Sequence, residues 1–156
     1  MDDPLEALLD EAIRHELTVS TLYFEFCQAF AEDSDFWWKL SVEEQGHAGL
    51  LRVGKTLIGA EFGREMLPAR AEELAESNRK LEEILEQIEH QPPSREDAFR
   101  IALGIETSTD ALIYEHALHP EEDSAGREIA QRIARDDLLH AERIRRRMKA
   151  QGIGEA

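Results

Sequence analysis

Apolar residues recur through most of the chain at alternating steps of three and four, the spacing of one buried face of an α-helix. The first stretch with this period covers residues 4–30, and Pro4 stands at its first helical position. Three further stretches, at about 36–60, 95–118 and 125–149, have the same period. No segment alternates apolar and polar residues over the length of a strand, so the pattern predicts an all-α fold.

The predicted helices are joined by connections of unequal length. Short turns at 31–35 and 121–124 join the first pair and the last pair, whereas about 34 residues separate the second helix from the third. This long connection contains a further helical stretch at about 69–90, whose apolar face can pack on its own bundle or on a second subunit. The pattern predicts a single domain over residues 1–156, a four-helix bundle of two antiparallel hairpins joined by a crossover that contains an additional helix.

Each predicted bundle helix interrupts its apolar face with polar residues near its midpoint. The interruptions are Glu16 in the first helix, Glu44 and His47 in the second, Glu106 in the third, and Asp137 and His140 in the fourth. Because they lie within about one turn of the helix midpoints, we expect them to meet at one level inside the bundle. Buried carboxylates without compensation cost several kcal/mol each, so cations are expected beside them.

The donor atoms of this set indicate which cations to expect. Four carboxylates balance two divalent ions, and oxygen and imidazole donors without thiolate favour iron or manganese. An acid and a His three residues apart lie on one face of a helix, so one helix supplies two ligands to one metal. The sequence therefore predicts two bound metal ions, with iron favoured and manganese as the alternative.

The two acid–His pairs belong to a repeat, because residues 43–48 and 136–141 both read acid-acid-x-x-His-Ala. Acids form about a fifth of the chain, so a single acid-x-x-His match is expected by chance. A repeat in the second helix of each hairpin instead indicates a duplicated hairpin. The leading acids of the repeat, Glu43 and Asp136, are predicted either to orient His rings on neighbouring helices or to be exposed. The alternative for the whole set is that these are ordinary polar residues on solvated faces.

These residues resemble the metal-binding motifs of the ferritin-like superfamily, especially bacterioferritins and rubrerythrins. The resemblance is carried by residues 11–18 with Tyr23 and Phe24, by 44–48, by 101–106 and by 137–142, but it does not include 69–90. It implies a di-iron centre in which Glu16 and His47 with Glu44 bind one iron, and Glu106 and His140 with Asp137 bind the other. Glu44 and Asp137 are then the bridging carboxylates.

The chain departs from those families in three ways. Asp137 stands where the family has Glu, so one bridging side chain is a methylene shorter. Thr109 stands where rubrerythrins usually carry a further Glu, and the single Cys27 excludes their rubredoxin centre, so an external electron donor is expected. Residues 150–156 are too short and too rich in Gly for the fifth helix of storage ferritins, which disfavours a cage.

Charge and composition limit the classes of molecule that the protein is expected to bind. The sum of 18 Lys and Arg against 34 Asp and Glu is −16, which disfavours nucleic acid and anionic membranes and favours cations. No apolar run approaches the length of a membrane span, and the first residues lack the positive charge of a signal peptide. We therefore expect a cytoplasmic protein that forms a homodimer or a larger homo-oligomer.

Three functions remain compatible with the sequence. The first is a di-iron oxidoreductase, with ferroxidase-like or peroxidase-like activity, in which bound Fe²⁺ reacts with O₂ or H₂O₂. The second is an iron storage or delivery protein that forms a larger assembly. The third is a metal-free helical adaptor whose helix at 69–90 binds a partner.

The remaining aromatic residues and histidines receive the following predictions. Tyr23 lies two turns from Glu16 on the same face, and it is predicted either to bond to a ligand or relay an electron, or to be a core residue. Trp37 is predicted to lie in the core. The remaining histidines are predicted to be solvated, and they are His15, His90, His116 and His119.

Overall fold

The computed structural model describes residues 4–58, 71–108 and 125–156, and every regular element in these ranges is helical. The elements are α1 (Pro4–Ala29), the 3-10 helix η1 (Ala31–Asp33), α2 (Ser34–Ile58), α4 (Ala71–His90), α5 (Arg95–Thr107) and α6 (Ala125–Ala150). The prediction of an all-α fold is confirmed for these residues. None of the helices in the described ranges has both the length and the apolarity needed to span a membrane.

The predicted end of the third bundle helix is wrong. The helix was expected to reach residue 118, but α5 ends at Thr107 and Ser108 has an extended backbone, with φ −68° and ψ 164°. The Thr107 hydroxyl donates to the Leu103 carbonyl at 2.7 Å, and the Ser108 hydroxyl donates to the Ile105 carbonyl at 2.9 Å. Such side-chain bonds compete with the main-chain bonds that would extend the helix. Residues 109–118 lie outside the described ranges.

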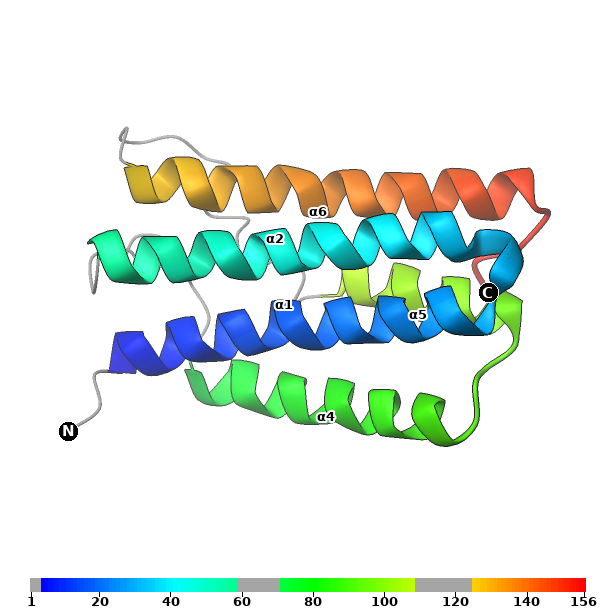
Figure 1. Ribbon diagram of the computed structural model, residues 1–156, viewed down its shortest axis with the longest axis horizontal. Coiled ribbons are helices and arrows are strands. Elements are labelled where there is room, and N and C mark those ends of the chain that lie inside the picture. Colours follow the sequence, from blue (N-terminus) through cyan, green and yellow to red (C-terminus); the bar gives the residue numbers. More distant parts are fainter. Residues whose placement is uncertain (1–3, 59–70, 109–124) are drawn as a thin grey trace.

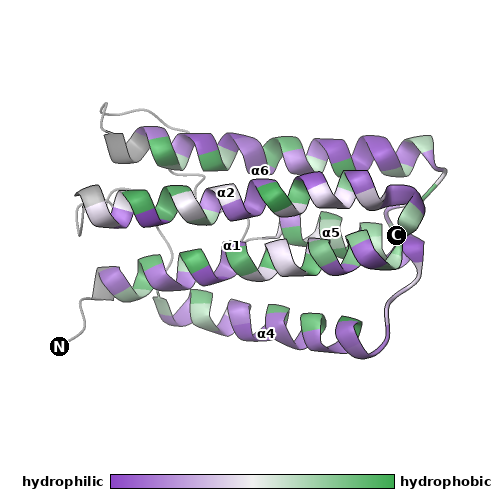
Figure 2. Ribbon diagram, in the orientation of Figure 1, coloured by the Kyte–Doolittle hydropathy of each residue, from purple (hydrophilic) through white to green (hydrophobic). Residues whose placement is uncertain are grey.

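The helices run side by side along the long axis of the molecule (Figure 1). α2 lies between α1 and α6 and is antiparallel to both, and α4 runs along the other side of α1 in the same direction as α1. α5 packs closely against α6. Figure 2 shows that each ribbon alternates between apolar and polar residues along its length, as expected for helices that bury one face.

Two apolar clusters fill the interior, and they are separated along the helices by polar residues. The first cluster includes Leu9 and Ile13 of α1 and Leu51 of α2. The second includes Val19 of α1 and Leu40 of α2. On α1, α2 and α6 the acids and histidines described below stand between the residues of the two clusters. The polar layer is therefore enclosed by apolar packing at both ends.

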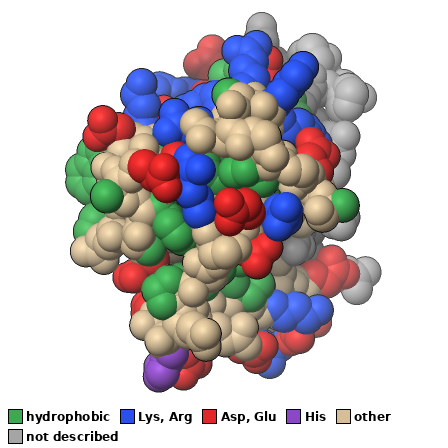
Figure 3. Space-filling model, turned by 90° about the vertical axis from the view of Figure 1, so that its right-hand side faces the viewer, with side chains coloured by type: hydrophobic (Ala, Val, Ile, Leu, Met, Phe, Trp, Pro, Cys, Tyr) green, Lys and Arg blue, Asp and Glu red, His purple; other side chains and the backbone are tan. Residues whose placement is uncertain are grey.

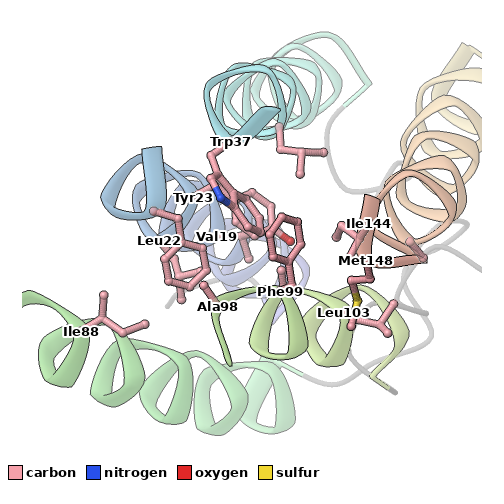
Figure 4. Close-up of a cluster of buried hydrophobic side chains, with 14 of the residues drawn as sticks. Val19, Leu22, Tyr23, Trp37, Ile88, Ala98, Phe99, Leu103, Ile144 and Met148 are labelled. Atoms are coloured by element: carbon pink, nitrogen blue, oxygen red, sulfur yellow. The ribbon is translucent and has the colours of Figure 1, made fainter. Parts of the chain in front are cut away.

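Trp37 belongs to the second cluster, which confirms the prediction that it lies in the core. Its side chain is fully buried, and its ring centroid lies 4.8 Å from that of Phe99 and 5.0 Å from that of Phe26. Figure 4 shows the Trp37 and Phe99 rings directed toward one another from α2 and α5. Contacts of this kind fix the position of α5 relative to α2 and thus the height at which α5 delivers its polar residue.

Asp33 joins three parts of the chain at one end of the bundle. Its side chain has no exposed surface, and its Oδ2 lies 2.5 Å from Arg95 Nε while its Oδ1 lies 2.9 Å from Arg147 Nη2. These ion pairs connect η1 to α5 and α6. Figure 3 shows this end of the molecule, where basic and acidic side chains lie intermixed on the surface.

Replacement of Asp33 by Asn is expected to lower the free energy of unfolding by about 2 kcal/mol at neutral pH, because two guanidinium groups lose their carboxylate. Burial would raise the pKa of Asp33, but hydrogen bonds from Arg95 and Arg147 hold it below its ordinary value. The stabilisation is therefore fully present above the ordinary aspartate pKa and is lost as pH falls through the folded value. Denaturant unfolding at a series of pH values should show wild type and Asp33→Asn converging below about pH 4.

The exposed Glu86 provides a control, because Glu86→Gln removes a charge without removing a buried ion pair. Its free energy of unfolding should stay within about 0.5 kcal/mol of wild type. An Asp33→Asn variant as stable as Glu86→Gln at neutral pH would contradict the role given to Asp33.

Candidate metal centre

All six residues that interrupt the apolar faces lie together in the interior. Each is buried, with at most 9% of its surface exposed. Their donor atoms form two sets within which all atoms lie within 4.8 Å of one another. One set is Glu16, Glu44 and His47, and the other is Glu44, Glu106, Asp137 and His140. Glu44 belongs to both sets, so the two sets meet at its carboxylate.

The two imidazoles both turn Nδ1 toward this centre. His47 Nδ1 lies 3.1 Å from Glu44 Oε2, and His140 Nδ1 lies 2.9 Å from Glu44 Oε1. Glu16 Oε2 is 3.6 Å from His47 Nδ1, and Glu106 Oε1 is 3.6 Å from His140 Nδ1. The rings are stacked with centroids 5.6 Å apart and planes inclined by 20°. Each oxygen of Glu44 therefore faces a different His, with a further acid beside each ring.

The outer nitrogens of both rings bond to acids from the opposite helix. His47 Nε2 lies 3.1 Å from Asp136 Oδ2 on α6, and His140 Nε2 lies 2.8 Å from Glu43 Oε2 on α2. The sequence predicted that these acids either orient His rings or are exposed, and the structure has the two ring contacts. A carboxylate at the outer nitrogen fixes the ring orientation and leaves the inner nitrogen directed at the centre.

Arg143 completes this arrangement, and the sequence analysis did not identify it. Its Nη1 donates to Glu43 Oε2 at 2.6 Å. The hydrogen bond from His140, together with Arg143 and against the effect of burial, lowers the pKa of Glu43 to about 2. The signal in the sequence was the spacing, since Arg143 follows His140 by three residues and so lies on the same face of α6.

Tyr23 reaches the centre from α1. Its side chain is fully buried, and its hydroxyl donates a hydrogen bond to Glu106 Oε1. Burial, and then the negative charge of Glu106, raise the pKa of Tyr23 well above its ordinary value, so the phenol keeps its proton. Of the roles predicted for Tyr23, the structure therefore has a hydrogen bond to one of the six residues, made from within the apolar core.

The six groups distribute protons unevenly. Burial, then the charges of Glu106 and Glu16, raise the pKa of Glu44 to about 8. Burial, then neighbouring acids, also raise the pKa of Asp137 well above its ordinary value. Burial opposes a charge on His47, but hydrogen bonds with Glu16 and Glu44 raise its pKa to about 11. The folded chain thus holds protons at neutral pH that a bound cation would displace.

Asp137 differs from Glu44 in its place in the centre. It belongs to one set alone, although its Oδ1 also lies 3.6 Å from His47 Nδ1. A side chain shorter by one methylene reaches less far across the interior. The symmetry between Glu44 and Asp137 that the family resemblance implies is therefore incomplete.

His15 was predicted to be solvated, and this prediction is wrong. Only 7% of its surface is exposed, and its Nδ1 is buried without a hydrogen-bond partner among the described residues. It precedes Glu16 by one residue and so points about 100° away around α1, toward α4 and α5. His15 lies off the apolar face that α1 turns toward the other predicted bundle helices, and it is buried because α4 covers it. His90 is exposed as predicted, and Thr109, His116 and His119 lie outside the described ranges.

No protein-family model, no curated protein and no solved structure matches this chain. The assignment of a function therefore depends on the geometry of the buried residues themselves.

Proposed function

We propose that this protein binds two metal ions at the buried acidic and histidine residues and is a di-iron carboxylate protein. The observation that carries the proposal is the position of Glu44, whose two oxygens face His47 and His140 at 3.1 Å and 2.9 Å. A carboxylate shared in this way is suited to bridge two ions. Glu16 and His47 would complete one site, and Glu106, Asp137 and His140 the other.

Coordination of metal ions would satisfy the buried acids and histidines better than their interactions with one another do. His140 Nδ1 is buried and lies 2.9 Å from Glu44 Oε1, but the contact lacks the geometry of a hydrogen bond. Without metal, protons held on Glu44, Asp137 and His47 offset the buried negative charge, whereas two divalent ions would balance four ionised carboxylates and leave both rings neutral. Oxygen and imidazole donors favour iron, with manganese as the alternative.

The arrangement of the helices supports the same class. α1 and α2 form one antiparallel pair, and α5 and α6 form another. In the sequence α4 stands between the two pairs, and in space it runs along α1 in the same direction as α1. We propose that this is the ferritin-like bundle that the motifs around Glu16, Glu44, Glu106 and Asp137 resemble. In this arrangement each helix of a four-helix bundle contributes to the centre, and α4 is the crossover helix.

Two bound iron ions would supply the electrons that reduce O₂ or H₂O₂, as in a ferroxidase-like or peroxidase-like protein. The chain supplies geometry and the exclusion of water. Glu43 and Asp136 hold the two rings, Tyr23 holds Glu106, and the apolar clusters at both ends limit access of solvent. Because the chain has a single Cys, a peroxidase-like reaction would draw its electrons from an external donor.

The proposal is tested by anaerobic titration with Fe²⁺ followed by addition of O₂ or H₂O₂, with near-ultraviolet absorbance as the measurement. We expect saturation at two irons per chain and rapid oxidation by one of the two oxidants. Continued uptake well beyond two irons would favour storage instead. Failure to bind Fe²⁺ or Mn²⁺ at micromolar concentration would contradict the metal site and leave a helical adaptor as the remaining function.

A further inference from the structure

A cavity lies beside the six buried residues, between α4 and α5, with His15 of α1 in its lining. Its volume is about 310 Å³, at the lower end of the range for small-molecule pockets. Its walls are apolar, formed by Leu81 and Ile84 of α4 and by Ile101 and Ile105 of α5. Ile84 keeps 37% of its surface exposed, although it lines a concave site. These walls therefore favour a ligand with an apolar ring or chain.

The charged residues of this pocket are cationic. Lys80 and Arg100 line it, and no carboxylate does so among the described residues. Arg100 pairs with Asp97 at 3.0 Å, whereas Lys80 has no ion-pair partner in the described part of the chain. A pocket lining that contains two cations and no carboxylate is unexpected in a chain of net charge −16. They make this pocket complementary to an anion.

His15 forms the inner boundary of the pocket. Its Nδ1 is the buried polar atom without a partner noted above, and such atoms are costly unless something bonds to them. His15 and Ile105 also line a small space of about 10 Å³ that touches Glu16, Glu44, Glu106 and Asp137. His15 and Ile105 therefore stand between the pocket and the buried acids, and a molecule in the pocket would have His15 as its contact on that side.

We propose that this pocket binds a small organic anion, with a carboxylate at Lys80 and Arg100, an apolar ring or chain along the walls, and a hydrogen-bonding group at His15. The three features sit on three helices and converge on one cavity, which is the reason for assigning one ligand rather than separate surface contacts. Binding does not require the metal ions, so the proposal stands apart from the di-iron function.

Gly104 allows the pocket to be filled without disturbing the fold. It lines the cavity, and a Cβ added there would meet no atom within 4 Å. Gly104→Leu should therefore occupy the cavity, and loss of a helical glycine should favour α5. Gly49→Leu is the matched control, because a Cβ at Gly49 also meets nothing within 4 Å but Gly49 lies on α2, away from the pocket.

The experiment is calorimetric titration of the full-length, metal-free protein with p-hydroxyphenylpropionate. Gly104→Leu should weaken binding at least about tenfold, and Gly49→Leu should leave it unchanged. Lys80→Glu should weaken it about fivefold, through loss and reversal of an exposed charge. Wild type should bind phenylpropionate, which lacks the hydroxyl, about fivefold more weakly than p-hydroxyphenylpropionate. His15→Phe should bind the two propionates with equal affinity.

Three results would overturn the assignment. Unchanged binding by Gly104→Leu would place the anion elsewhere. Equal binding of tyramine, which has the same ring with an ammonium in place of the carboxylate, would exclude recognition of an anion. Equal affinity of wild type for the two propionates would remove the contact with His15. Because no metal is present, none of these results depends on the di-iron proposal, which the Fe²⁺ titration tests separately.

Discussion

Replacement of Glu44 by Gln is expected to weaken binding of both metal ions by at least about a hundredfold each, because one carboxylate is shared by the two sets of donor atoms. The amide keeps the shape of the side chain but carries no charge. In the metal-free state the variant should be at least as stable as wild type, since Glu44 lies among other buried acids. Thermal unfolding with and without metal, together with metal analysis of the dialysed protein, measures both effects.

His140→Ala is the informative comparison for this variant. His140 belongs to one set only, so this substitution should remove one ion and leave the site formed by Glu16, Glu44 and His47. Asp136→Asn, which changes only the acid at the outer nitrogen of His47, should weaken binding by about ten- to a hundredfold. Retention of two ions per chain by Glu44→Gln would refute the bridging position of Glu44.

Raising the pH from 6.5 to 8 is expected to destabilise the metal-free protein while it tightens metal binding. In the folded chain the pKa of Glu44 is raised by burial and neighbouring acids to about 8, and that of His47, against the effect of burial, is raised by its acid partners to about 11. Groups whose folded pKa lies above the unfolded one contribute stability at low pH and lose it as pH rises toward the folded value. For these two groups the expected loss over this interval is about 3 kcal/mol.

Bound metal reverses the sign of this dependence. A cation displaces the protons on Glu44 and His47, so its apparent affinity should rise by up to about tenfold per pH unit for each proton released. Denaturant unfolding of the metal-free and metal-loaded protein at several pH values tests the two trends together. Metal-free stability that increased between pH 6.5 and 8 would contradict the protonation assigned to the centre.

The location of the centre was predictable because it depends on local periodicity. A polar residue that replaces an apolar one at a buried helical position must point inward if the helix packs at all. All six residues were found in this way, and the acid–His spacing then indicated that Glu44 with His47 and Asp137 with His140 can each serve one metal. The end of α5 was not predictable from periodicity, because the hydroxyls of Thr107 and Ser108 compete with the helix there.

The sequence by itself determined the helices, the six residues that interrupt their apolar faces and the level at which those residues meet. Each of these follows from the pitch of one helix at a time. Only the tertiary structure decided that Glu44 faces both histidines. It also decided that Glu43 of α2 bonds to the His on α6 while Asp136 of α6 bonds to the His on α2. Finally, it decided that α4 covers His15 beside a pocket lined by two cations. These contacts join different helices, so they depend on the rotation and offset of each helix against its neighbours, which packing of the whole chain sets.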